Sequence, residues 1–429
     1  MDTRTAHALV RFGLGRRGAE PLPPDPTAWL LDQIRQPDPA RFDDPPTTAK
    51  GLAALREDRA TKPPPGESRA RALYKAQAAA QLANAVMTPA PFRERLVWFW
   101  TNHFVISLRR GQCTAVAAAF VEEAIRPHVT GPFNDMLLAV IRHPAMLLYL
   151  DNATSVGPDS LAGQRSHRGL NENLARECLE LHTVSPLATY TQADVTAFAK
   201  ILTGWSIDLQ ADPPGFRYRP FAHEPGIQTV LRQPFPPDEA GGITALRFLA
   251  NHPATHRFLA TKLARHFVAD DPPPEAIRAI EGVLRDTSGD LGATSAALVK
   301  LDAAWQPATK LRTPMDFVVA SVRALDLPAD QLPPMTGILA GLGQPLWAAP
   351  APNGWPDHAA DWASPEAMLR RIDWASGFAG RIGDRDVIEV ADTALGPLLR
   401  SETRDAVRHA GSRRDAMTLL LTSPEFQRR

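Results

Sequence analysis

Hydrophobic residues recur at helical spacing along almost the whole chain. Residues 92–107 are apolar on nearly every side, and a helix that is apolar all round is buried. We therefore expect a central, buried helix at this position. Asp25 and Pro26 form a suitable cap and first turn for a helix that ends near Ile34. Further helices are predicted at residues 69–87, 114–125, 133–141, 144–150, 171–183, 191–205, 244–251, 253–268, 274–285, 293–300, 314–325, 335–341, 365–377, 403–409 and 412–421.

Segments that break the helical pattern are few. Residues 56–67 are charged and contain prolines, which predicts a loop. Residues 216–231 alternate and contain β-branched side chains, which favours a small β-hairpin. Strands do not alternate with helices, and no repeat of fixed length occurs. The sequence therefore predicts a mainly α fold, a multi-helix single domain over residues 1–429, with 56–67 as a sub-boundary.

Composition narrows the class of protein. Hydrophobic residues make up 44% of the 429 residues, as in an ordinary soluble globular protein. The formal net charge is zero, so no basic field attracts nucleic acid. No apolar run is long enough to span a membrane, and the N-terminus lacks a secretory signal, so we expect a cytoplasmic protein. Cys113 and Cys178 alone form neither a disulfide framework nor a cysteine-rich zinc site.

Charge is densest in residues 171–183, a short helical segment between apolar ones. Glu177 and Glu180 share its polar face, whereas His182 lies almost opposite Glu180. The three side chains therefore cannot converge on one metal ion from an intact helix. No Glu-x-x-His pair of the di-iron type is present either.

Two interpretations of this polar face remain open. In the structural one, Glu172–Arg176 and Arg176–Glu180 are ion pairs one turn apart, each stabilising the helix by about 0.2–0.5 kcal/mol. In the functional one, the face packs toward the helix at 92–107, and Glu177 and Glu180 are shielded from water. A crowded carboxylate in such a cleft has a raised pKa and can act as an acid or base.

Histidines would supply the second side of such a cleft. His103 lies on the most buried predicted helix, and His223 lies in the predicted hairpin. The candidate catalytic residues are therefore Glu177, Glu180, His103 and His223. Trp355 and Trp362, in a loop rich in Gly, Pro and Asp, are candidates for the rim of the cleft, whereas Trp98 and Trp100 are expected in the core.

Several motifs together resemble a family of uncharacterised bacterial proteins, domain of unknown function 1800. They cover nearly the whole chain and include Ala6–Gly15, Trp98–Phe104, His143–Asn152, Asn171–Thr183, Tyr190–Val195, Thr203–Trp205, His252–Thr255, Lys262–Leu263, Arg312–Pro314 and Gly354–Asp357. The resemblance implies one mainly helical unit and brings no established activity. Members of the family are often exported and often co-encoded with a sulfatase-like protein.

The chain departs from the family pattern in two places, at its N-terminus and in the predicted hairpin. The match begins almost at the first residue, which leaves no room for a signal. His223-Glu224 stands where the family usually has His-Asp, and Gln228 stands where a lysine is more usual. These changes put a role for the hairpin in doubt.

Two functional hypotheses follow. The first is an enzyme-like helical protein with a shielded carboxylate/histidine cleft, acting by acid–base chemistry or with a metal assembled from separate helices. The second is a non-catalytic partner or scaffold for a sulfatase-like protein. The sequence identifies no substrate, cofactor or metal.

Overall fold

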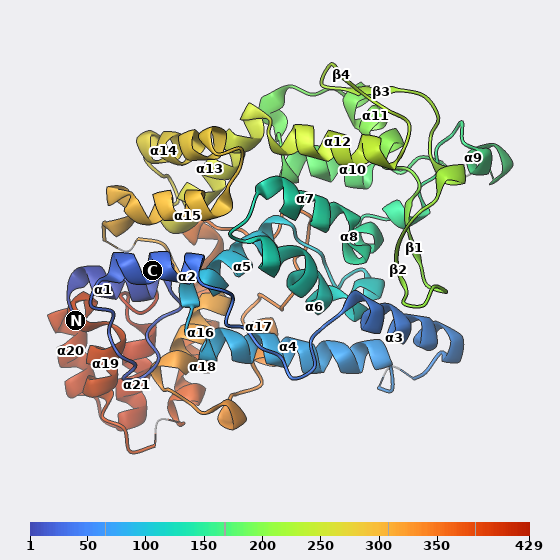
Figure 1. Cartoon of the computed structure of the whole chain (residues 1–429). Coiled ribbons are helices and arrows are strands. Elements are labelled where there is room, and N and C mark those ends of the chain that lie inside the picture. The colour runs from blue at the N-terminus through green and yellow to red at the C-terminus, as the bar shows by residue number, and fades with distance from the viewer. Residues whose placement is uncertain (65, 167–168, 308, 382) are drawn as a thin grey trace.

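The computed structural model describes residues 1–64, 66–166, 169–307, 309–381 and 383–429, and helices dominate it (Figure 1). The first half contains α1 Thr3–His7, α2 Pro26–Arg35, α3 Thr48–Thr61, α4 Arg69–Met87, α5 Pro91–His103, α6 Ala117–Phe120, α7 Phe133–Arg142, α8 Pro144–Tyr149, α9 Leu161–Ser166, α10 Asn173–Glu177 and α11 Gln192–Leu202. The second half contains α12 Glu239–Ala250, α13 Pro253–Phe267, α14 Pro274–Asp286, α15 Leu291–Lys300, α16 Pro314–Ala324, α17 Met335–Gly341, α18 Pro365–Ala379, α19 Val387–Ala394, α20 Ser401–Arg408 and α21 Arg413–Thr422.

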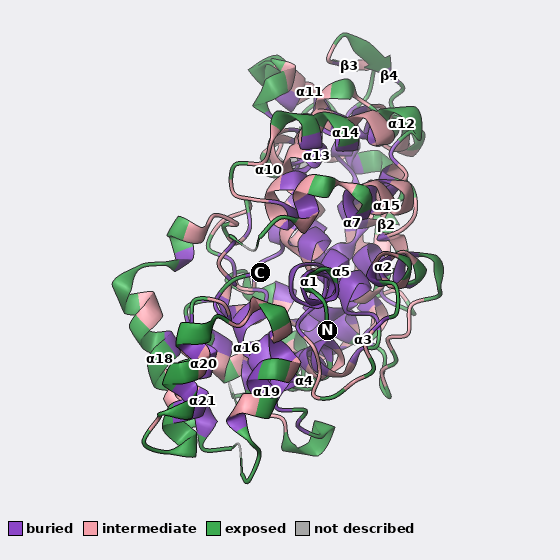
Figure 2. Ribbon diagram, turned by 90° about the vertical axis from the view of Figure 1, so that its left-hand side faces the viewer, coloured by how far each residue is buried: buried purple, intermediate pink, exposed green. Residues whose placement is uncertain are grey.

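Helix α5 is the central element, as its all-round apolar pattern predicted. It lies in the middle of the molecule, and the other helices cover it (Figure 2). Ten of its 13 residues are buried, including Phe92, Leu96 and Trp100. Pro91 begins the helix at a first-turn position, where a missing N–H costs nothing. The helix ends at His103, four residues earlier than its apolar run, because Phe104 leaves the helical conformation.

The helix cap predicted at Asp25 is present in the structure. The Asp25 carboxylate accepts hydrogen bonds from the backbone N–H groups of Thr27 and Ala28 and begins α2. Pro144 occupies the first turn of α8, and the preceding His143 caps that helix. Helices α1, α3, α9 and α19 are not among those predicted from the sequence.

The loop expected at residues 56–67 is wrong over its first half, since α3 continues to Thr61. Arg56, Glu57 and Asp58 are partly buried and Arg59 is exposed, and charge alone does not end a helix. Asp58 instead accepts hydrogen bonds from Ser68 Oγ and the Ala70 N–H, so α3 caps the start of α4.

Four short strands form two hairpins. Antiparallel pairs join β1 Trp205–Asp208 to β2 Gly215–Tyr218, and β3 Gln228–Val230 to β4 Gln233–Phe235. The sequence predicted a single hairpin at residues 216–231. The structure has two hairpins, and this segment supplies β2 to one and β3 to the other. Pro220 and Pro225 interrupt the segment, and proline cannot donate to a strand ladder. The fold is mainly α with small β elements.

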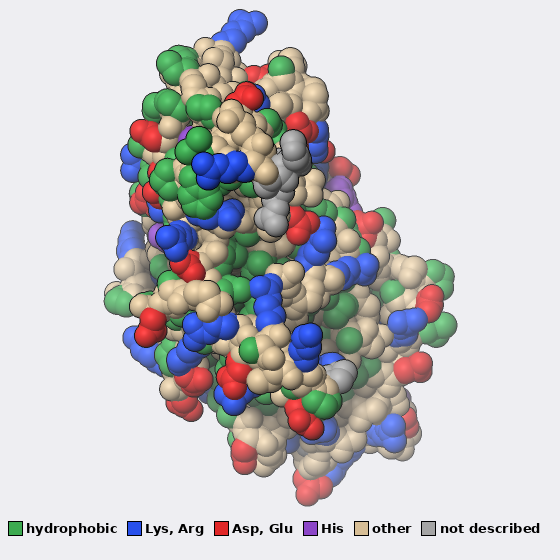
Figure 3. Space-filling view, turned by 90° about the vertical axis from the view of Figure 1, so that its right-hand side faces the viewer, with side chains coloured by type: hydrophobic (Ala, Val, Ile, Leu, Met, Phe, Trp, Pro, Cys, Tyr) green, Lys and Arg blue, Asp and Glu red, His purple; other side chains and the backbone are tan. Residues whose placement is uncertain are grey.

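The face of the molecule in Figure 3 carries charges of both signs. Basic and acidic side chains are intermixed on the face that Figure 3 shows, as expected for zero net charge. Among the described residues, no helix combines the length and the apolar character needed to cross a membrane.

The polar segment at 171–183 packs the opposite way from our expectation. Helix α10 continues into a π-helical turn at Cys178–His182, and the buried face consists of Leu174, Cys178, Leu179 and His182. Glu177 and Glu180 are only partly buried on the other face. The expected packing of the polar face against α5 is wrong, because the same helix has an apolar face whose burial needs no paired charges.

Arg176 does not depend on Glu180 for a partner. It forms an ion pair with Glu172 and a hydrogen bond with Gln192, at 3.0 and 2.8 Å. The side chains of Arg176 and Glu172 keep 39% and 29% of their exposure, so solvent screens this pair.

We expect Glu180→Ala to lower the free energy of unfolding by less than about 1 kcal/mol, because a partly exposed carboxylate loses little on truncation. Leu179→Ala, one residue away on the buried face, should cost about 2–5 kcal/mol. Chemical denaturation of both variants measures the difference. A loss of about 3–5 kcal/mol for Glu180→Ala would show instead that its carboxylate holds a buried partner.

Candidate functional site

A cavity of about 260 Å³ lies between α5, α13 and the loop at residues 344–358. Its volume suits a small molecule. One part of its wall is apolar and aromatic, with Trp98, Phe99, Leu346, Trp347 and Trp355. The polar part comes from α5, α13 and the loop and includes His103, Lys262, Arg265, His266 and Asp357.

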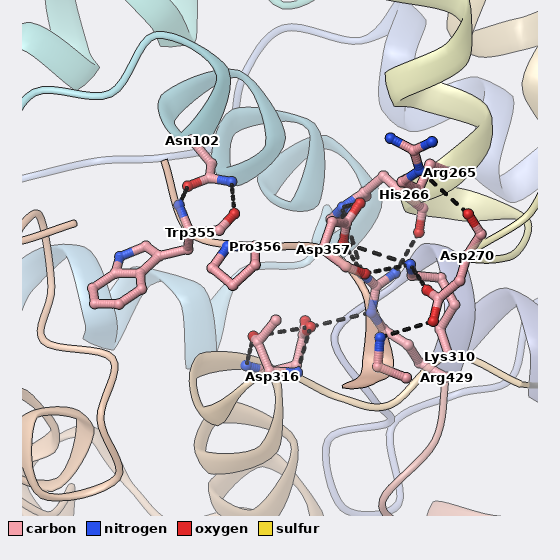
Figure 4. Close-up of polar contacts among 12 residues, drawn as sticks. Asn102, Arg265, His266, Asp270, Lys310, Asp316, Trp355, Pro356, Asp357 and Arg429 are labelled. Carbon is pink, nitrogen blue, oxygen red and sulfur yellow. Dashed lines mark hydrogen bonds and ion pairs between the residues drawn. The ribbon is translucent and has the colours of Figure 1, made fainter. Parts of the chain in front are cut away.

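Two hydrogen bonds fix the loop against the central helix. The Asn102 side chain donates to the Trp355 carbonyl oxygen at 2.9 Å and accepts from the Trp355 N–H at 2.7 Å (Figure 4). Gly354 makes this approach feasible, since its φ is +81° and a Cβ there would lie 2.5 Å from the Asn102 carbonyl oxygen. The clamp places Asp357 beside α13.

Tryptophans form part of the cavity wall. Trp355 lines the cavity, and its ring lies 6.0 Å from that of Trp362, whose Nε1–H donates to the Pro356 carbonyl oxygen. Trp362 therefore packs against Trp355 and is not itself a lining residue of the cavity. Trp100 is in the core as expected, whereas Trp98 is partly exposed and lines the cavity.

A buried ion-pair network borders the cavity, and Arg95 and Asp316 are among the lining residues. Asp316 Oδ1 lies 2.7 Å from Arg95 Nη1, and its Oδ2 lies 3.1 Å from Arg429 Nε. Burial by itself would raise the pKa of Asp316, but the two guanidinium groups outweigh burial and hold the pKa well below its usual range. Asp316 is therefore charged, and it also caps α16 through Thr313.

Asp357 joins this network to α13. The Lys310 ammonium donates to the Asp357 carbonyl oxygen and pairs with Asp270, both at 2.6 Å (Figure 4). Both carboxylate oxygens of Asp357 lie 3.2 Å from His266 Nδ1. Burial opposes ionisation of Asp357, but His266, Lys310 and Arg429 lower its pKa well below the usual range.

His266 presents a neutral ring to the cavity. Its Nδ1 carries the proton, because a charged carboxylate only accepts. Burial lowers the pKa of His266 to about 4, despite the opposing effect of Asp357. Its Nε2 is buried and has no hydrogen-bond partner among the described residues, so it is an acceptor that a ligand can use.

Lys262, one turn before His266 on α13, contacts His103 of α5. His103 Nε2 lies 3.1 Å from the His182 carbonyl oxygen, which can only accept, so Nε2 carries the proton. Nδ1 is therefore an acceptor, and Lys262 Nζ donates to it at 3.0 Å. Burial first, and then Lys262, keep the pKa of His103 well below its usual value, so His103 is neutral.

Lys262, which is partly exposed, differs from the buried Lys310 in its partners. Lys310 has a carboxylate partner, Asp270, whereas no carboxylate of the described residues forms an ion pair with Lys262. Burial lowers the pKa of Lys262 to about 8, although Asp357 acts in the opposite direction. A neutral amine is therefore accessible near physiological pH.

The sequence placed one of its four candidate residues at this cavity. His103 lines it. Glu177 and Glu180 lie on the partly exposed face of α10 and the following turn, where burial and then Glu180 raise the pKa of Glu177. His223 lies near β2, where its Nδ1 donates to the Thr203 carbonyl oxygen at 2.8 Å. The structure does not bring these four side chains together.

Sequence reasoning missed Lys262, His266 and Asp357. A usable signal was present, because Lys262, Arg265 and His266 are spaced to share one helix face. In the described part of the chain, no group of three or more His, Cys, Asp or Glu side chains is arranged to hold a metal ion.

We expect Lys262→Met to be more stable than the parent by about 1–2 kcal/mol at pH 7, because it removes an ammonium that lacks a carboxylate partner. The folded pKa of about 8 lies below an unfolded value of about 10.4, so the unfolded parent binds more protons between these values. Parent stability then rises with pH across that window, and the advantage of Lys262→Met shrinks.

Denaturation at pH 7 and pH 10 measures this change, with exposed Lys75→Met as the control. An equal difference at both pH values, or a Lys262→Met variant less stable than the parent at pH 7, would contradict the assignment.

The motifs that resemble the family lie partly around this cavity, and a comparison with known proteins finds the same family. Segments of the resemblance meet there, including Trp98–Phe104, Lys262 and Gly354–Asp357. No curated protein and no solved structure matches the chain. The model of the family described as "Protein of unknown function (DUF1800)" matches residues 7–428. Because this match covers nearly the whole chain, the protein belongs to the DUF1800 family.

Proposed function

We propose that this protein is an enzyme that acts by acid–base chemistry on a small molecule bound in the cavity, with Lys262 as the group that gains and loses the proton. One observation carries the proposal. Lys262 Nζ lies at the cavity wall, 3.0 Å from an unprotonated nitrogen of His103, and it forms no ion pair with a carboxylate of the described residues.

Lys262 is suited to this role by its protonation. An acid–base group works best when its pKa lies near the operating pH, and the pKa of Lys262 is about 8. As an ammonium it can donate a proton to a ligand. As a neutral amine it has a lone pair that can accept a proton from carbon, oxygen or nitrogen.

His103 acts through Lys262 and is a positioning residue. Its neutral Nδ1 accepts one of the N–H groups of Lys262, and the His182 carbonyl oxygen fixes the ring in that tautomer. The remaining hydrogens of Nζ are free for a ligand. His103 stays neutral, so it does not compete for the proton.

His266 supplies a second ligand contact. Asp357 orients its ring, and the unpartnered Nε2 can accept a hydrogen bond from a bound hydroxyl or amine. Its pKa of about 4 makes it a weaker base than Lys262. The aromatic walls, including Trp98 and Trp355, exclude water and bind a flat or apolar part of the ligand.

Proton abstraction from nitrobenzisoxazole, a flat carbon acid that any suitably placed base opens to a coloured phenolate, tests the proposal without knowledge of the natural substrate. We expect the rate to rise with pH through about 8 and then to level off, as Lys262 loses its proton. Lys262→Met should lower the rate by about a hundredfold or more.

His103→Phe should lower the midpoint of the pH profile, because the ammonium loses its acceptor and its charged form becomes less favourable. Lys75→Met, which removes an exposed amine, should leave rate and profile unchanged. A rate that survives in Lys262→Met would overturn the proposal. The alternative hypothesis, a non-catalytic partner of a sulfatase-like protein, would then take its place.

A further inference from the structure

Three side chains of α13 form one stripe along the cavity. Lys262, Arg265 and His266 occupy positions i, i+3 and i+4, which place them on the same face of the helix. All three line the cavity. Lys262 and Arg265 are basic side chains, so this part of the wall favours a ligand with negative charge or a polarised oxygen.

Arg265 has the free groups needed to bind a carboxylate. Its Nε donates to the Asp270 carbonyl oxygen at 3.2 Å, which holds the start of the guanidinium (Figure 4). No carboxylate of the described residues forms an ion pair with its terminal nitrogens. A guanidinium in this state offers two parallel N–H groups to a carboxylate ligand.

Lys262 provides a different chemistry one turn away. Its amine lies against the ring of Phe258, with Nζ 5.5 Å from the ring centre, and beside neutral His103. A ring face attracts an ammonium, but burial of the Lys262 amine outweighs this attraction and lowers its pKa. A neutral lysine amine is a nucleophile toward carbonyl carbon. Lys262 and Arg265 lie three residues apart on α13 and line the same cavity. A ligand that carries a carbonyl group beside a carboxylate would use both side chains.

We propose that Lys262 condenses with the carbonyl group of a small α-oxo acid whose carboxylate is held by Arg265. This inference rests on the proposed acid–base function and names its substrate class. The Nζ lone pair forms a bond to the carbonyl carbon, and the C=O π electrons move to oxygen. Both hydrogens of the neutral amine then leave with that oxygen as one water molecule, which gives an imine.

Each neighbour has a defined part in this step. His103 accepts a hydrogen bond from Nζ and so directs the amine. The aromatic wall limits access of water, which would hydrolyse the imine. Lys310 cannot act in the same way, because Asp270 and the Asp357 carbonyl oxygen hold its ammonium.

The test is reductive trapping of the full-length protein with pyruvate and cyanoborohydride, followed by peptide mass spectrometry. Hydride from the reagent adds to the imine carbon and makes the adduct permanent. We expect modification at Lys262 and none at Lys310 under native conditions. Lys262→Met should show no adduct at this peptide, with its denaturation midpoint confirming that it is folded.

Arg265→Met separates carboxylate recognition from amine reactivity. It should lower labelling by pyruvate about tenfold, whereas labelling by acetone, which has no carboxylate, should not fall. Labelling of exposed Lys75 at the same rate as Lys262, or pyruvate labelling unchanged in Arg265→Met, would overturn the inference.

The two proposals fail in distinguishable ways. If Lys262-dependent opening of nitrobenzisoxazole occurs without pyruvate trapping, the acid–base function stands and the α-oxo acid assignment is wrong. If neither reaction depends on Lys262, both proposals are wrong.

Discussion

The buried carboxylate of Asp316 is the constraint around which this part of the molecule is built. It lies between Arg95 of α5 and Arg429 near the end of the chain, so one anion joins three segments that are far apart in sequence. A buried charge is tolerated only when it is paired. Removing this carboxylate would leave two guanidinium groups buried side by side, so α5, α16 and the last residues must meet in this arrangement.

Charge pairing also explains why Lys310, which is buried, and Lys262, which is partly buried, differ. Lys310 belongs to the supporting network, because Asp270 and the Asp357 carbonyl oxygen neutralise and bind its ammonium. Lys262 instead donates a hydrogen bond to a neutral imidazole nitrogen, and no carboxylate of the described residues pairs with it. Such an arrangement costs stability at neutral pH and keeps a neutral amine within reach, which is a balance typical of active sites.

The π-helical turn at Cys178–His182 supports the candidate site through its contact with His103. It ends at His182, whose carbonyl oxygen is left outside the helical hydrogen bonding and accepts from His103. The same turn buries the His182 ring against Phe104. Residues that drew attention for their charge thus contribute mainly through a backbone carbonyl, which fixes the tautomer of His103.

The sequence by itself determined the helical architecture and the burial of α5, because helical periodicity and all-round apolarity are local properties. It also identified His103 and the loop at Trp355, which line the cavity. It did not show which face of residues 171–183 would be buried, since that helix has two faces and only its neighbours select one.

The tertiary structure alone decided the composition of the site. Lys262 and His103 are separated by 159 positions along the chain, and Asp357 and His266 by 91. Each pair depends on the packing of α5, α13 and the loop held by Asn102, which no local pattern records. The low pKa of Lys262 follows from the same packing, because burial and the absence of a carboxylate partner are properties of the assembled cavity.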